Sequence, residues 1–76
     1  MRNTAFIKLT IREAAPYGET NHRQAYINIG EIVEITEQQD NRTNERFSHI
    51  RLRDGREIDV STLPEAIIRK IAGVEN

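Results

Sequence analysis

Two polar segments carry the side chains best suited to binding chemistry in this 76-residue chain. The planar guanidinium of Arg matches phosphate groups, and the amides of Asn and Gln can read the edge of a nucleobase. An aromatic ring beside them can stack on an adenine, a role open to Tyr17, Tyr26 and Phe47. The candidate ligand-binding residues of the two segments are Asn21, His22, Arg23, Gln24, Arg42, Thr43, Asn44, Arg46 and Phe47.

A simpler interpretation exists for the second segment, QQDNRTNER from Gln38 to Arg46. It contains no hydrophobic residue, and polar connections of this kind are commonly solvated hairpin loops without a ligand. Taken alone, the segment favours that interpretation. The ligand hypothesis therefore rests on the two polar segments together.

Catalysis is not expected from this sequence. The chain has no cysteine, and Ser48 and Ser61 have no base placed beside them. The carboxylates are spread along strands and loops, and the four glycines are isolated, so no phosphate loop is formed. His22 and His49 lack metal-ligand spacing, so we expect neither a metal nor another cofactor. His49 is better interpreted as half of a surface pair with Asp59 than as a general base.

Composition limits the partners. The formal net charge of −1 argues against a dedicated nucleic-acid binder, which usually has a basic excess. No apolar run or signal-peptide core is present, so we expect no membrane association. The lack of cysteine fits a cytoplasmic protein, in the host cytoplasm if the source is viral. A single domain over residues 1–76, without disulfides to stabilise it, favours a homo-oligomer.

The segment from Phe47 to Val60 predicts a β-hairpin. Its apolar residues alternate with charged ones on both sides of Asp54-Gly55. A three-residue loop with Gly55 in the left-handed region keeps all apolar side chains on one face, whereas a two-residue loop does not. The predicted pairs are Ile50 with Ile58, Arg51 with Glu57 and His49 with Asp59.

A short amphipathic helix is predicted directly after this hairpin. Thr62 and Glu65 form a capping box around Pro64, and Gly73 is a natural stop after the last turn. The apolar stripe of this helix is Ile67, Ile68 and Ile71, and Arg69 and Lys70 lie in its last turn, the favourable end for positive charge.

The first half of the chain predicts further strands. Residues 5–12 alternate with Ile7, Leu9 and Ile11 inward and with Phe6, Lys8, Thr10 and Arg12 outward. Residues 13–23 form a polar connection, and residues 24–29 alternate again. The alternation slips at Gly30-Glu31, where a bulge or one helical turn is expected, and a strand resumes to about residue 37. Phe6 and Tyr26 face outward and suit an oligomer contact, and Asn28 suits a local backbone hydrogen bond. The expected fold is α+β, a small bent antiparallel sheet of four or five strands covered by the C-terminal helix.

Three stretches resemble the small flagellar FlbD proteins, also called SwrD. They are IKLT, YINIGEIVEITE and the hairpin HIRLRDGREIDV with the following LPEAIIRKI. The resemblance covers roughly two thirds of the chain and implies a motility adaptor that acts by protein–protein contact. This chain departs from the pattern in its two extended polar connections.

The same features are similar to those of the viral Thoeris anti-defence proteins, small oligomeric β-rich domains with a helix. This resemblance implies sequestration of cyclic nucleotide-type immune signals such as cyclic ADP-ribose isomers, and it assigns no site residues. The leading hypothesis is therefore a non-enzymatic, oligomeric binding protein for such a ligand. The alternatives are an FlbD-like adaptor and a small DNA-binding module similar to LytTR domains, against which the near-neutral charge argues.

Overall fold

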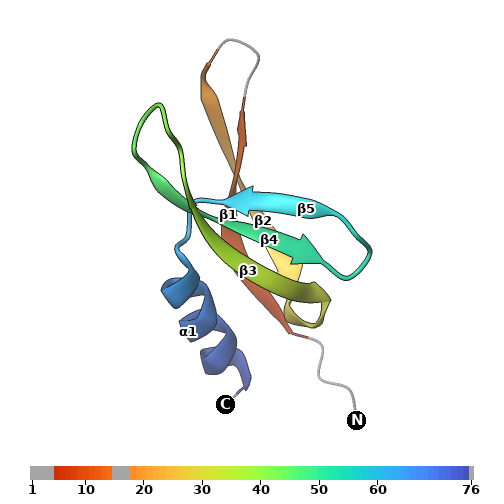
Figure 1. Cartoon of the computed structure of the whole chain (residues 1–76). Helices are drawn as coiled ribbons and strands as arrows, with labels where there is room; N and C mark the ends of the chain where they lie inside the picture. The colour runs from red at the N-terminus through yellow and green to blue at the C-terminus, as the bar shows by residue number, and fades with distance from the viewer. Residues whose placement is uncertain (1–4, 15–17, 76) are drawn as a thin grey trace.

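The computed structural model describes residues 5–14 and 18–75, in which five antiparallel strands precede one helix (Figure 1). The expected α+β fold, a bent antiparallel sheet with one C-terminal helix, is confirmed. The elements are β1 (Phe6–Ala14), β2 (Thr20–Asn28), the 3-10 turn η1 (Ile29–Glu31), β3 (Ile32–Gln39), β4 (Arg46–Leu52), β5 (Glu57–Val60) and α1 (Pro64–Glu75).

The sheet has the strand order β2-β1-β5-β4-β3. β1 and β2 pair along their whole lengths, whereas β1 and β5 pair only at Ile11 and Val60. Because this junction is so short, the β1–β2 hairpin is not held parallel to the other strands. In Figure 1 it crosses β4 and β5 and projects beyond them, and the molecule is 46 Å long.

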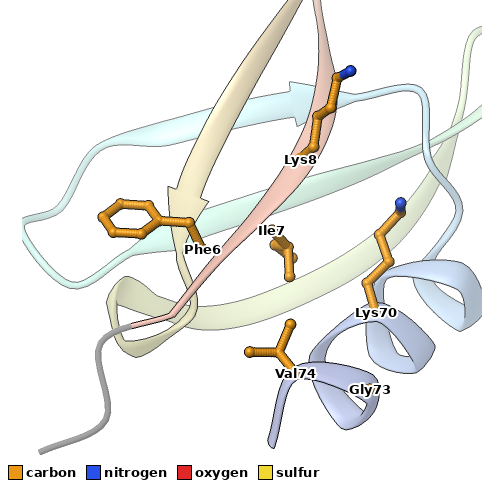
Figure 2. Close-up of a pocket in the computed structure, with 6 residues that line it drawn as sticks. All are labelled: Phe6, Ile7, Lys8, Lys70, Gly73 and Val74. Atoms are coloured by element: carbon orange, nitrogen blue, oxygen red, sulfur yellow. The ribbon is translucent and has the colours of Figure 1, made fainter.

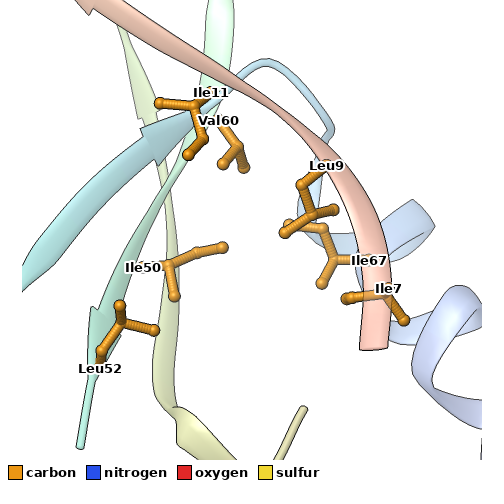
Figure 3. Packing of buried hydrophobic residues seen from close by; sticks show 7 residues of the cluster. All are labelled: Ile7, Leu9, Ile11, Ile50, Leu52, Val60 and Ile67. Atoms are coloured by element: carbon orange, nitrogen blue, oxygen red, sulfur yellow. The ribbon is translucent and has the colours of Figure 1, made fainter. Parts of the chain in front are cut away.

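The core lies on the inner face of the bent sheet, beneath α1. Ile7, Leu9 and Ile11 of β1 point inward as predicted, toward Ile50 of β4 (Figure 3). Ile67 reaches this core from α1, which contacts β1 and β3. Burial of apolar surface is the main stabilising term in so small a fold. The buried cluster is Ile7, Leu9, Ile11, Ile50, Leu52, Val60 and Ile67.

The prediction of a polar connection over residues 13–23 is wrong. β1 continues to Ala14 and β2 begins at Thr20, which pairs with it. Polar side chains pair across this extension, including Glu13 with Arg23 at 3.3 Å. This part of the hairpin projects beyond the core, so neither face needs apolar residues and the alternation that marks a half-buried strand is missing. Likewise β3 continues to Gln39 and β4 begins at Arg46, which shortens the second connection to residues 40–45.

The alternation of inward and outward side chains changes phase near Gly30, and two structural features cause this change. The expected helical turn is present over residues 29–31, and the Asn28 side chain accepts a hydrogen bond from the N–H of Gly30 at 2.9 Å. The register with β4 then shifts by one residue between Ile32 and Glu34. Val33, the extra residue, is exposed, while Ile32 packs against the core.

The β4–β5 hairpin has the predicted register and loop. Arg51 pairs with Glu57, and the N–H of Leu52 donates to the carbonyl of Arg56 at 2.8 Å, which leaves residues 53–55 as the loop. Gly55 has φ +94°, in the left-handed region. The parity of the apolar residues was therefore sufficient to determine this turn.

Replacing Gly55 with Val should lower the free energy of unfolding by about 1.5 kcal/mol, because a β-branched residue resists positive φ. No atom lies within 4 Å of a Cβ placed on Gly55, so the penalty comes from the backbone alone. Chemical denaturation measures it. Gly55→Asn is the matched control, since Asn tolerates this conformation, and equal losses in both variants would contradict the assignment.

The predicted start and the predicted end of the helix are both wrong. The carbonyl of Leu63 accepts the first helical hydrogen bond from Ile67 at 3.1 Å, so the helix begins at Pro64, one residue later than a Thr62 cap requires. At the other end the helix passes through Gly73 to Glu75. Ile68, expected in the apolar stripe, is 58% exposed.

Within the described residues, no helix has the length and apolar character needed to cross a bilayer.

Candidate functional site

The nine predicted ligand-binding residues are placed on strands as well as on a loop. Asn21, His22 and Arg23 lie on β2, contrary to the expected connection, and Gln24 lies on β2 as predicted. The loop between β3 and β4 carries Arg42, Thr43 and Asn44, while Arg46 and Phe47 belong to β4. Tyr17, a candidate for stacking, lies outside the described residues, and Tyr26 is exposed on β2.

Most of the predicted residues are engaged by the fold itself. Arg23 pairs with Glu13, Arg46 pairs with Glu37, and the Gln24 amide donates to the Thr10 hydroxyl at 3.2 Å. In the loop, the Thr43 hydroxyl accepts from the N–H of Glu45, and the N–H of Asn44 donates to the carbonyl of Asp40. The loop over residues 40–45 is thus closed by its own hydrogen bonds.

Arg42, in the loop between β3 and β4, reaches the β1–β2 hairpin. Its Nη1 atom lies 3.5 Å from the position that a Cβ on Gly18 would take. A hollow of about 60 Å³ lies between the two hairpins at this end of the sheet. It is lined by Arg12, Ala14, Thr20, Asp40, Arg42 and Asp59.

Arg12, expected to face solvent, is buried beneath the β3–β4 loop, with only 8% of its side chain exposed. Its guanidinium carbon lies 4.3 Å from the centre of the Phe47 ring, and its Nη2 atom contacts Asp40 at 3.4 Å and Glu45 at 3.2 Å. Phe47 is itself buried. The face of Phe47 that we expected to stack on a base is therefore occupied by Arg12.

Charge is balanced in the loop-end cluster, which consists of Arg12, Asp40, Arg42 and Glu45. The backbone N–H of Arg42 donates to Asp40 at 2.9 Å, and this bond, followed by the bond from Arg12, holds the pKa of the Asp40 carboxyl below its ordinary value. Two carboxylates thus neutralise Arg12, and Arg42 also lies beside Asp40. A hollow this small and this well neutralised is poorly suited to a nucleotide, whose sites typically measure about 300–1,000 Å³.

A second polar cluster surrounds His49 on β4. Its Nδ1 lies 2.7 Å from Asp59, the residue predicted to oppose it, and its Nε2 contacts Glu57. The hydrogen bonds to Asp59 and then to Glu57 raise the pKa of the imidazole, because the protonated ring donates to both carboxylates. Both ring nitrogens are thereby engaged in the cross-strand pair.

The raised pKa of His49 predicts a pH-dependent stability. The protonated ring contributes fully below about pH 6.5, the unfolded-state value, and this contribution is lost as the pH rises through the higher folded-state pKa. The wild-type protein should therefore lose stability as the pH rises above about 6.5, and His49→Gln should flatten this slope. Urea denaturation at several pH values measures it, with His22→Gln on β2 as the control. An unchanged slope in His49→Gln would contradict the prediction.

A larger hollow in the described residues is a groove between the start of β1 and the end of α1, with a volume of about 260 Å³. Figure 2 shows Ile7 and Val74 pointing toward each other across it, with the amino groups of Lys8 and Lys70 on one side. Phe6, which is 53% exposed, adds an aromatic ring. The lining residues are Phe6, Ile7, Lys8, Lys70, Gly73 and Val74.

The groove differs electrostatically from the loop-end cluster. Among the described residues, neither Lys8 nor Lys70 forms a salt bridge, and no acidic residue lines the groove. Two uncompensated ammonium groups beside an apolar surface suit an anion that carries an apolar or aromatic part. The described part of the chain has no group of three or more His, Asp or Glu side chains that could hold a metal ion.

Comparisons with protein-family models, curated proteins and solved structures gave no match. The resemblances to FlbD and to Thoeris anti-defence proteins therefore stay expectations.

The groove residues were absent from the predicted site. The alternation of β1 indicated that Phe6 and Lys8 face outward, and Lys70 was expected near the end of the helix. No local pattern connects these two segments, which are more than sixty residues apart in the sequence.

Proposed function

We propose that this protein is a non-enzymatic binding protein that sequesters a nucleotide-type anion in the groove between β1 and α1. The observation that carries the proposal is the presence of Lys8 and Lys70, both without salt-bridge partners in the described residues, beside the apolar Phe6, Ile7 and Val74. Ammonium groups bind phosphates as point charges, and the apolar side chains offer surface to a base.

Sequestration means binding without turnover. Apart from the two amines, the groove residues have no side chain that could carry a proton or attack a ligand. The resemblance to anti-defence proteins supplies the biological context, in which a cyclic nucleotide-type immune signal is withheld from its receptor. A protein that acts stoichiometrically in this way needs affinity and abundance, and it needs no catalytic group.

The proposal includes the association of two copies of the chain around the ligand. The groove is open and slightly smaller than typical nucleotide sites, so a single chain covers only part of such a ligand. Tyr26 is 68% exposed on β2, and β2 is the last strand of the sheet in the described residues. Association of copies through this edge would cover Tyr26, which lies beside Lys8 in the β1–β2 register.

Isothermal titration with AMP, cyclic AMP, cyclic di-AMP and cyclic ADP-ribose tests the proposal. At least one of these should bind, and Lys8→Glu and Lys70→Glu should each weaken binding by about tenfold or more, the loss expected for one charge-assisted contact. Arg69→Glu is the matched control, because Arg69 is exposed on the same helix and does not line the groove. Mass spectrometry of the released ligand should show an unchanged mass.

Three results would contradict the proposal. The first is the absence of binding by all four ligands to the wild-type protein at millimolar concentration. The second is an equal loss of affinity in Arg69→Glu and Lys70→Glu, which would indicate a general effect of charge. The third is conversion of the ligand during incubation.

A further inference from the structure

The groove exposes part of a strand edge. Ser61 donates a backbone hydrogen bond to the carbonyl of Thr10 at 2.9 Å, so the backbone groups of Thr10 point away from β2, toward β5. On the opposite side, the carbonyl of Ala5 accepts from the N–H of Ile29 at 3.0 Å, just beyond the β2 end of the ladder. Even-numbered residues of β1 therefore direct their N–H and C=O groups away from β2.

Among these even-numbered residues, two have backbone N–H and C=O groups that pair with no strand of the described residues. β5 pairs with β1 only at Ile11, so the edge at Phe6 and Lys8 has no neighbouring strand in the described residues. None of the backbone hydrogen bonds outside the regular ladders involves Phe6 or Lys8. The end of α1 lies across the groove from this edge, with Lys70 and Val74 lining the opposite side.

We propose that the carbonyl of Phe6 and the backbone N–H of Lys8 form hydrogen bonds with the edge of an adenine-type base. The side-chain ammonium groups of Lys8 and Lys70 bind the phosphate of the same nucleotide. The carbonyl and the N–H are consecutive groups on one strand edge and form an acceptor beside a donor. The amino group and adjacent ring nitrogen of adenine are a donor beside an acceptor, which is the complementary pair. This inference rests on the proposed function and specifies the base that the groove selects.

The side chains on either side of the edge fit a flat ring. Phe6 and Ile7 are consecutive on β1, so they leave the strand on opposite faces. A ring held in the plane of the strand would therefore have an apolar side chain near each of its faces, with Val74 across the groove from Ile7 (Figure 2). Burial of both faces of a base adds stacking and hydrophobic energy to the two hydrogen bonds.

An extended peptide would use the same edge less well. Strand addition depends on a row of main-chain hydrogen bonds, and the open edge provides these from Phe6 and Lys8, since Thr10 already bonds to Ser61. A small ligand needs only one donor and one acceptor. Charge also favours the nucleotide, because Lys8 and Lys70 both line the groove and no acidic residue among the described residues does so.

Three probes separate base recognition from anion binding: AMP, N6,N6-dimethyl-AMP and ribose 5-phosphate. Dimethylation removes the amino donors and keeps the ring and phosphate, and the sugar phosphate lacks the base. We expect AMP to bind at least tenfold more tightly than either analogue. In ¹⁵N-labelled protein, the Lys8 amide proton should move downfield with AMP and remain nearly unmoved with ribose 5-phosphate.

The outcomes distinguish this inference from the proposed function. Equal, lysine-dependent affinities for all three probes would overturn base reading and leave the groove as an anion site. A preference for AMP without a shift at Lys8 would also overturn it, because the base would then be recognised elsewhere. Absence of binding by all three, together with failure of the cyclic nucleotides, would overturn both proposals. Lys70→Glu should weaken AMP and ribose 5-phosphate by the same factor, since it removes only the phosphate contact.

Discussion

Ile67→Ala should lower the free energy of unfolding by about 3 kcal/mol, the largest effect expected for one residue of α1. Ile67 is fully buried, and it is the residue of the helix that enters the core cluster formed by β1, β4 and β5. Truncation removes the favourable free energy of transferring these side-chain atoms from water into the core. It also leaves a cavity that the surrounding strands can fill only in part. A twelve-residue helix is marginal in isolation, so its attachment depends on this contact.

Ile68→Ala is the matched control for this prediction. It is the next residue of the same helix, of the same type, and it is 58% exposed. We expect a change of at most about 0.5 kcal/mol, as for most surface substitutions. Urea denaturation followed by circular dichroism measures both variants, and similar losses in the two would show that the helix packs on a different face.

Arg12→Met should lower the free energy of unfolding by about 2 kcal/mol. Breaking a fully buried ion pair costs about 3–5 kcal/mol, because a charge is left without its partner. The cost should be smaller here, since Glu45 is more than half exposed and Met retains contact with the Phe47 ring. The loss arises mainly from Asp40, whose side chain is only 15% exposed and loses its contact with Arg12.

Arg23→Met on β2 is the control for the buried cluster. Arg23 and Glu13 are both more than half exposed, so the substitution should change stability by less than about 1 kcal/mol. The double variant Arg12→Met with Asp40→Asn should recover part of the loss, because it also removes the carboxylate that has lost its contact with Arg12. Equal losses in Arg12→Met and Arg23→Met would contradict the role assigned to Arg12.

The polar part of the β1–β2 hairpin was not predictable from its pattern. Sequence alternation reports burial of one face, and it marks β1 clearly from Ile7 to Ile11, where that face meets the core. Beyond Ile11 the hairpin leaves the core, and its residues are held by backbone pairing with β2 instead. Backbone hydrogen bonds are the same for every residue type except Pro, so they leave no mark on the sequence.

The candidate site was predicted less well than the fold, for a related reason. The predicted residues looked suitable because of their types, yet the three arginines among them, Arg23, Arg42 and Arg46, all have acidic partners. Whether a cation has a partner depends on which carboxylates lie near it in space. Lys8 and Lys70 were ordinary surface residues in the sequence, and they became a candidate site only through their position across the groove.

The sequence by itself determined the features whose physical causes are local. Parity and Gly55 specified the register and loop of the β4–β5 hairpin, and Asn28 and Gly30 specified the turn before β3. The tertiary structure alone decided that Arg12 is buried and that β1 and α1 form a groove. Those outcomes depend on contacts between segments distant in the chain, and such contacts follow from how the sheet bends at the single pair of Ile11 and Val60.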